Sequence, residues 1–176
     1  MHAKRTENDP RAVVAEFPGA HRVWLWRNIV VICWYGNPSA AAADRLTEMT
    51  GELLAGMAPT EKLSYVHLVT RKLTLPDAAT RASLLDSTHR FADRTALSGV
   101  VVSGGGFWAS AVRGFVTGIA VLAPRSLDLR VFGSSQQLVP WFTTEHAKRT
   151  GVRVDGDELL KVLEQAEASC ANLGEH

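Results

Sequence analysis

Residues 100–115 read VVVSGGGFWASAVRGF, and this stretch decides the fold class. Residues 100–102 are an apolar run of the kind found in strands that are covered on both faces. Three glycines follow, and the apolar residues after them repeat at helical spacing. The stretch therefore predicts a strand that passes through a tight glycine turn into a helix.

The same alternation continues on both sides of this unit. Upstream, RVWLW at 22–26 and IVVICWY at 29–35 predict an opening hairpin with a two-residue turn. Further strands are expected at 63–70, 96–103 and 127–133, each followed by a helix. Strands that alternate with helices in this way predict an α/β domain with a mostly parallel sheet. With the hairpin included, we expect a mixed sheet of four or five strands in which residues 100–102 are central.

The chain has 176 residues, which is about the size of one domain. We expect a polar N-terminal arm at 1–21, the α/β domain at 22–150, and an amphipathic helical extension at 151–176. The extension has an apolar side that needs cover, made by Leu159, Leu160, Leu163 and Ala166. We expect it to dock on its own domain or on a second subunit, with a homodimer favoured.

The bulk composition excludes several classes of protein. The net charge is +1, and no stripe of Lys and Arg lies beside the tryptophans, so no nucleic-acid partner is expected. The longest apolar segment, 107–123, is interrupted by Arg113 and is shorter than the roughly 20 residues that span a bilayer. Only two cysteines are present and the first ten residues are polar, so we expect a cytoplasmic protein without an integral membrane segment.

Two parts of the chain resemble the STAS/SpoIIAA-like superfamily. RVWLWRNIVVICWYG at 22–36 is similar to the opening hairpin of that family. VVVSGGGFWASAVRGFVTGI at 100–119, followed by LRVFGSSQQLVPWF at 129–142, is similar to its last strand–helix–strand–helix unit. The resemblance extends over roughly 22–147. It implies a single STAS-like domain that works without catalysis, through contact with a protein partner in bacterial regulation or assembly.

The resemblance also implies a place for a phosphorylated hydroxyl, after the third strand. Family members that act as anti-sigma-factor antagonists have an Asp-Ser-Ser-Gly-like tetrapeptide there. This chain has TRKLTLPDAATRAS instead, with Thr74 and Thr80 as the nearest hydroxyls. We therefore expect no usual phospho-switch, and Thr74 or Asp77 is interpreted as a helix cap.

The sequence contains no strong motif for catalysis, phosphate binding or metal binding. Ser103 and the glycines Gly104, Gly105 and Gly106 could form an anion-binding loop at a helix N-terminus, but no Lys follows them as in a phosphate-binding loop. A turn that needs positive φ is the preferred interpretation. The six histidines are scattered, none is paired for a metal site, and His67 is expected to be a core or edge group of its strand.

Three functions are kept open. The first is a protein-interaction module, with Trp24 and Trp26 on one sheet face as a candidate partner surface together with the two threonines named above. The second is a carrier or sensor of a small apolar ligand or lipid, in a pocket between sheet and helices lined by Phe107, Trp108, Phe115 and Trp141. The third is an enzyme that uses the glycine loop as an anion site. No cofactor or metal is expected, and an open apolar cavity would favour the second function over the first.

Overall fold

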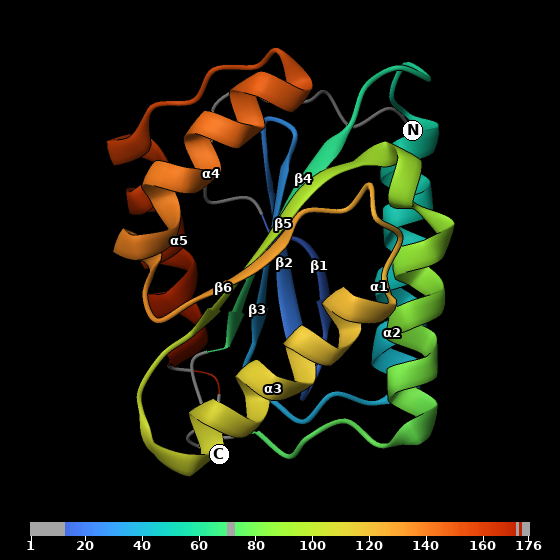
Figure 1. Cartoon of the computed structure of the whole chain (residues 1–176), viewed down its shortest axis with the longest axis vertical. Coiled ribbons are helices and arrows are strands. Elements are labelled where there is room, and N and C mark those ends of the chain that lie inside the picture. Colours follow the sequence, from blue (N-terminus) through green and yellow to red (C-terminus); the bar gives the residue numbers. More distant parts are fainter. Residues whose placement is uncertain (1–12, 70–72, 172, 174–176) are drawn as a thin grey trace.

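A computed structural model describes residues 13–69, 73–171 and 173, and it has an α/β fold with helices on both faces of one sheet (Figure 1). The strands are β1 Val13–Phe17, β2 His21–Trp26, β3 Ile29–Trp34, β4 Leu63–Val69, β5 Thr95–Val102 and β6 Leu129–Phe132. The helices are α1 Ala40–Ala55, α2 Ala78–Arg90, α3 Gly106–Leu122, α4 Ser135–Thr150 and α5 Gly156–Ala171, with a 3-10 turn η1 at Ala92–Arg94.

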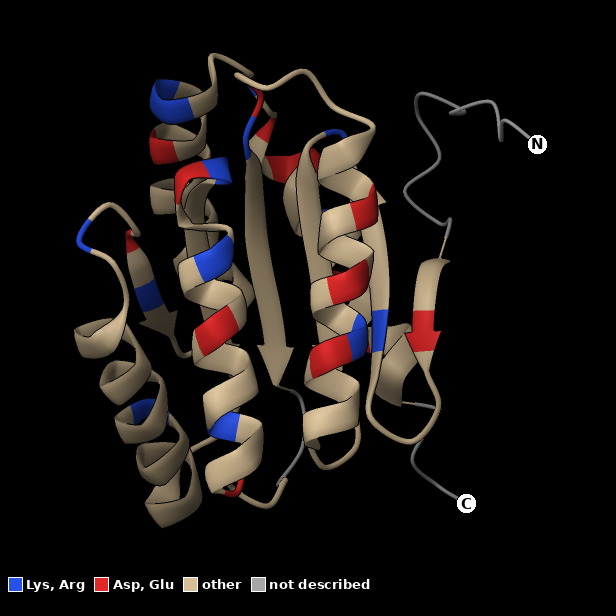
Figure 2. Cartoon of the chain, turned by 90° about the vertical axis from the view of Figure 1, so that its right-hand side faces the viewer, with Lys and Arg blue, Asp and Glu red and all other residues tan. Residues whose placement is uncertain are grey.

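The six strands lie side by side in their order along the chain. The first three pair antiparallel, and β3, β4, β5 and β6 pair parallel. The connections between the parallel strands run through α1, α2 and α3, which cover one face of the sheet, while α4 and α5 cover the other (Figures 1 and 2). The mixed α/β sheet expected from the sequence is confirmed, but β5 lies second from the edge, between β4 and β6.

Within the described residues the sheet has six strands rather than the expected four or five. The additional strand is β1, which lies in the segment expected to be a polar arm; residues 1–12 of that arm lie outside the described residues. Val13 and Val14 are exposed, so β1 is held mainly by its backbone pairing with β2 rather than by burial. Its sequence, VVAEF, is mostly apolar but has no alternation of apolar and polar residues, so the pattern did not predict a strand.

Alternate residues of each strand enter two separate cores. In β3, Ile29, Val31 and Cys33 belong to the core beneath α4 and α5, whereas Val30 and Ile32 face α1 and α3. All six residues of β3 are buried. Such burial on both faces is the reason for the continuous apolar runs in the sequence.

Helix α5 completes the first of these cores. Its buried residues are Leu159, Val162, Leu163, Ala166 and Cys170. It packs on β3 and α4 of its own chain, so the apolar side of the 151–176 segment finds its cover within the same domain. The docking site on the sheet is therefore intramolecular, and the helix is part of the α/β layer structure.

Short polar side chains begin four of the helices within the described residues, and one of them is Asp155, which accepts a hydrogen bond from the Glu158 amide at the start of α5. Ser39 accepts a hydrogen bond from the Ala42 amide at the start of α1, and Ser134 accepts one from the Gln137 amide at the start of α4. Asp77 does the same for the Thr80 amide at the start of α2. The cap at Asp77 was expected from the sequence, because such a side chain satisfies amides that have no partner within the helix.

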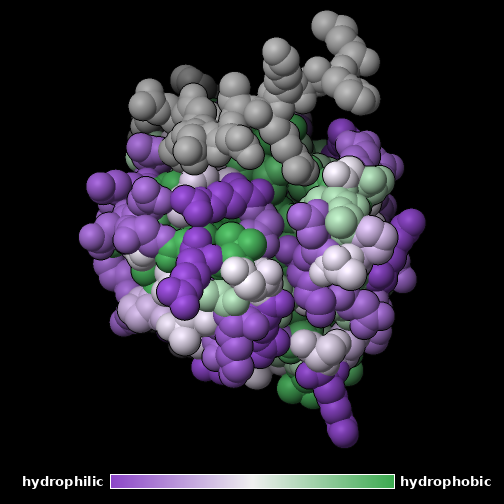
Figure 3. Space-filling model, turned by 90° about the horizontal axis from the view of Figure 1, so that it is seen from above, coloured by the Kyte–Doolittle hydropathy of each residue, from purple (hydrophilic) through white to green (hydrophobic). Residues whose placement is uncertain are grey.

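The molecular surface is largely hydrophilic in the view of Figure 3, with smaller hydrophobic areas between the polar side chains. Helix α3 is the main exception, because Phe107, Val121 and Leu122 are all exposed. None of the helices within the described residues combines the length and the apolar character needed to cross a membrane. The exposed apolar side chains of α3 thus belong to a helix that lies on the sheet.

Glycines at two kinds of position shape the backbone. Gly104 and Gly106 have φ of 90° and 83°, so the turn before α3 does need positive φ. A side chain on Gly36 would instead meet backbone, since an added Cβ would lie 1.7 Å from the carbonyl oxygen of Gly19. Gly36 donates its amide to Ala20, and this close approach joins the end of β3 to the turn before β2.

We predict that Gly36→Ala destabilises the fold by about 3 kcal/mol, because a fixed backbone segment has to move to admit the methyl group. The matched control is Gly114→Ala in α3, where an added Cβ meets nothing within 4 Å. That change should stabilise by about 0.5–1 kcal/mol, as expected when alanine replaces glycine in an exposed helix. Urea denaturation of both variants measures the difference, and equal effects at the two positions would contradict the account of Gly36.

Candidate functional site

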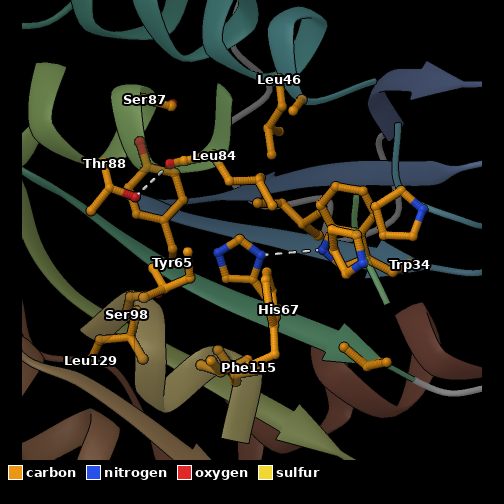
Figure 4. Close-up of a pocket in the computed structure, with 18 of the residues that line it drawn as sticks. Trp34, Leu46, Tyr65, His67, Leu84, Ser87, Thr88, Ser98, Phe115 and Leu129 are labelled. Atoms are coloured by element: carbon orange, nitrogen blue, oxygen red, sulfur yellow. Dashed lines mark hydrogen bonds between the residues drawn. The ribbon is translucent and has the colours of Figure 1, made fainter. Parts of the chain in front are cut away.

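A cavity of about 200 Å³ lies between the sheet and helices α1, α2 and α3 (Figure 4). Its floor is formed by β3, β4, β5 and β6, and its walls by the three helices and the segment that precedes α2. Most of the lining is apolar, including Ile32, Leu46, Leu84, Val100, Phe115 and Leu129. The cavity is partly open to solvent, because the exposed residues Thr74 and Leu75 form part of its lining.

Short side chains and a weakly buried helix create this space. Thr80, in its first turn, is the buried residue of α2, so this helix does not fill the volume above β4 and β5. Where α2 faces the sheet it contributes Ser87 and Thr88, and β5 contributes Ser98 beneath them. On the opposite face of the sheet, the space is filled by large side chains such as Phe142 and Leu138, which are fully buried.

His67 of β4 faces the cavity with one ring nitrogen already occupied. The indole Nε1–H of Trp34 donates a hydrogen bond to His67 Nδ1 over 3.3 Å. An indole can only donate, so Nδ1 has to be the unprotonated nitrogen and Nε2 carries the proton in the neutral ring. In Figure 4 the second ring nitrogen of His67 lies on the side away from Trp34, within the cavity.

Tyr65 lies two residues earlier on β4 and lines the same cavity. It is 8% exposed, and its hydroxyl has no hydrogen-bond partner among the described residues. Burial raises the pKa of Tyr65 to about 12, and the nearby Thr50 hydroxyl offsets this shift only in part. The phenol is therefore a neutral donor at neutral pH, and it stacks beside the His67 ring with 6.4 Å between the ring centroids.

The electrostatic environment keeps the His67 imidazole uncharged. Burial, and to a smaller extent the nearby His21, lowers the pKa of His67 from 6.5 to about 4. No Lys, Arg, Asp or Glu occurs among the described residues that line the cavity. The site thus offers hydrogen-bond donors in a neutral, largely apolar space. Such a space suits binding of a small molecule, and the described residues include no group of His, Cys, Asp or Glu placed to hold a metal ion.

A second buried histidine lies on the opposite face of the sheet. Ser64 Oγ and His146 Nδ1 are 2.8 Å apart, and neither residue is exposed. Phe142 stacks on the His146 ring with 5.8 Å between centroids. This pair joins β4 to α4 inside the filled core, so its role is to connect two layers of the fold.

The four residues expected to line one pocket do not lie together: they are found on both faces of the sheet and in solvent. Phe115 lines the cavity, whereas Trp108 lies beside it and donates its indole N–H to the Leu73 carbonyl over 2.8 Å. Phe107 is 91% exposed. Trp141 lies on the other face of the sheet, where it packs against Phe132. The sequence placed all four on helices next to strands, but it could not assign the face toward which each ring is turned.

The two tryptophans expected as a partner surface are interior residues. Trp24 and Trp26 are 5% and 6% exposed, and both belong to the core beneath α4 and α5. They do share one sheet face, as their spacing predicted, but α5 covers that face. The surface of this chain therefore does not present them to a partner.

The two threonines differ in accessibility. Thr80 is 1% exposed, in the first turn of α2, so its hydroxyl is not accessible for modification in the folded chain. Thr74 is exposed; its amide donates to Asn37 Oδ1, and the residue lies at the cavity lining. Hydrogen bonds from Thr80 hold the pKa of Asp77 below its usual value, which agrees with the helix-cap role expected for Asp77.

The glycine loop is held by its own chain. The Ser103 amide donates to the Val69 carbonyl, and Arg113 of α3 reaches the carbonyls of Val102 and Gly104 at 3.4 Å. Gly105 has extended backbone at the N-cap of α3, and an added Cβ at Gly104, Gly105 or Gly106 would meet nothing within 4 Å. Positive φ, rather than close helix–sheet packing, is thus what the loop needs from its glycines.

Sequence reasoning interpreted His67 as a core or edge group and did not single out Tyr65. The signal was present in LSYVHLV, because alternate residues of a strand share a face and residues 65 and 67 are two apart. The sequence did not show that Trp34 is the hydrogen-bond partner of His67, because Trp34 lies 33 residues away on the neighbouring strand. No protein-family model matches this chain, and no curated protein or solved structure matches it.

We predict that the protein loses stability as the pH falls from about 6.5 to about 4. Burial lowers the pKa of His21, His67 and His146 to about 4 in the folded chain, whereas an unfolded histidine titrates near 6.5. Between these values the unfolded state binds more protons, so acid favours unfolding by roughly 3 kcal/mol per histidine at most. Urea denaturation at several pH values measures the slope. His67→Met should reduce it, and an unchanged slope in that variant would contradict the assignment.

Proposed function

We propose that this protein is a non-enzymatic carrier or sensor that binds a small, largely apolar ligand in the cavity beneath α1, α2 and α3. The observation that carries the proposal is the cavity itself, open in a fold whose other core is filled. An engineered apolar cavity of about 150 Å³ binds benzene, so about 200 Å³ is enough for a substituted aromatic ring or a short branched chain.

The polar groups of the site support a binding function. A space that served only as a packing defect would be expected to be lined by apolar atoms alone. Here the buried Tyr65 hydroxyl has no hydrogen-bond partner among the described residues, and His67 is oriented by Trp34. A few placed polar groups within an apolar lining are typical of ligand pockets.

We predict that toluene raises the melting temperature of the full chain by a few degrees, because a ligand that binds only the folded state stabilises it. Ser98→Leu, which places a larger side chain in the cavity, should remove this response. Ser126→Leu, at an exposed serine outside the lining, is the matched control and should preserve it. If toluene and benzene both leave the melting temperature of the unmodified protein unchanged, the proposed function is wrong.

The STAS-like interaction module is the second candidate, and the exposed side of α3 favours it. Phe107, Gly114 and Val121 are seven residues apart and therefore share one side of the helix. Phe107 is 91% and Val121 78% exposed, and Arg113 is the charged residue of α3 (Figure 2). Exposed apolar residues gathered on one helix face are typical of surfaces that bind another protein.

We predict that the double change of Phe107→Ser and Val121→Ser alters the unfolding free energy by less than about 0.5 kcal/mol per site, because both side chains are in solvent. If α3 is an interface between two copies, the changes should also weaken self-association, which light scattering measures over a range of concentrations. A chain that is monomeric at all concentrations, before and after the change, would exclude a homodimer through α3.

A further inference from the structure

The donor that His67 presents to the cavity has a fixed identity. Because Trp34 donates to Nδ1, the neutral ring carries its proton on Nε2, and among the described residues no partner accepts that proton. Rotation of the ring would break the hydrogen bond to Trp34, which is itself buried. The Nε2–H of His67 therefore has a fixed orientation in the cavity, and it acts only as a hydrogen-bond donor.

Among the described residues, the lining of this cavity offers no counter-charge to a charged ligand. The described lining lacks Lys, Arg, Asp and Glu, and His67 is neutral at pH 7. Moving an ionised carboxylate or ammonium into such a space is costly unless an opposite charge is present. The described part of the lining thus disfavours both anions and cations.

We propose that the ligand is a neutral molecule with an apolar body about the size of an aromatic ring and one carbonyl-type acceptor, which accepts the Nε2–H of His67. This inference rests on the proposed function and specifies its ligand class. Tyr65 supplies a second donor from the same strand, since its hydroxyl is buried and without a partner among the described residues. Aryl ketones, aldehydes and esters satisfy these requirements, whereas hydrocarbons leave both donors unpaired.

Trp34 is a positioning residue in this arrangement. It lies on β3, two residues beyond Ile32, which is opposite His67, and it contacts the ring nitrogen that faces away from the ligand space. Without its N–H, Nδ1 loses the contact that selects the tautomer, and Nε2 can then be either a donor or an acceptor. Trp34→Phe should therefore reduce the preference for carbonyl ligands while leaving the cavity apolar.

The test compares acetophenone with cumene, in which a methyl branch replaces the carbonyl oxygen. Binding of each to the full chain is measured by calorimetry or by NMR titration, in the unmodified protein and in His67→Met. The ratio of the two affinities should shift toward cumene by about 3- to 10-fold in His67→Met, as expected for the loss of one hydrogen bond. Val116→Ala, which trims an apolar lining residue, is the matched control and should change both affinities similarly.

A second measurement needs no variant. Long-range ¹H–¹⁵N NMR of the unmodified protein should show His67 as the Nε2–H tautomer, and acetophenone, but not cumene, should shift the Nε2 resonance. Benzoate should bind more weakly than acetophenone at pH 7. If both ligands bind but the affinity ratio is unchanged in His67→Met, or if His67 is the Nδ1–H tautomer, the inference is wrong while the proposed function stands. If neither ligand binds, the proposed function itself fails.

Discussion

The arrangement of the whole chain depends on the sequential order of its parallel strands. From β3 to β6 each strand pairs with the next one along the chain, so the three crossovers advance across the sheet in one direction. Crossovers between parallel strands are right-handed almost without exception, and right-handed crossovers that advance in one direction place their helices on the same face. Helices α1, α2 and α3 consequently share one face, and the opposite face is bare until α4 and α5 return to cover it.

Because different sets of helices cover the two faces of the sheet, the side chains are packed differently on each face. The covering helices α4 and α5 pack on each other and on the sheet, with Phe142, Leu138, Leu159 and Leu163 fully buried between them. The crossover helices have to connect strand ends as well as cover the sheet, and α2 packs mainly on α1. The volume beneath α2 is therefore not filled by side chains, and this volume is the cavity.

Strand β4 contributes different polar side chains to the filled core on one face of the sheet and to the cavity on the other. Ser64 points to one side and pairs with His146, while Tyr65 and His67 point to the other and line the cavity. The hydrogen bond between Trp34 and His67 depends on the parallel register of β3 and β4, which sets Trp34 opposite Val69 and Ile32 opposite His67. A half-buried imidazole with a single orientation follows from that register, and the binding function that we propose depends on it.

Local patterns in the sequence determined the elements of this fold. Alternation of apolar residues marks the hairpin and the later strands, Asp77 and Ser134 mark helix starts, and the glycines before α3 mark a turn with positive φ. Each of these features depends on neighbours a few residues away, so it can be recognised without the fold. The α/β class and the mixed sheet follow from the order of such features.

Only the tertiary structure decided which residues meet. It paired β1 with β2, turned Trp24 and Trp26 beneath α5, and set the ring of Trp141 on the face opposite Phe115. It also joined Trp34 of β3 to His67 of β4 and left the Tyr65 hydroxyl without a hydrogen-bond partner among the described residues. A strand's periodicity shows that two residues share a face, but which helix covers that face, and whether it fills the space, depends on strand order, register and the path of distant segments. The cavity is a property of those long-range contacts, and for that reason no local pattern in the sequence contained it.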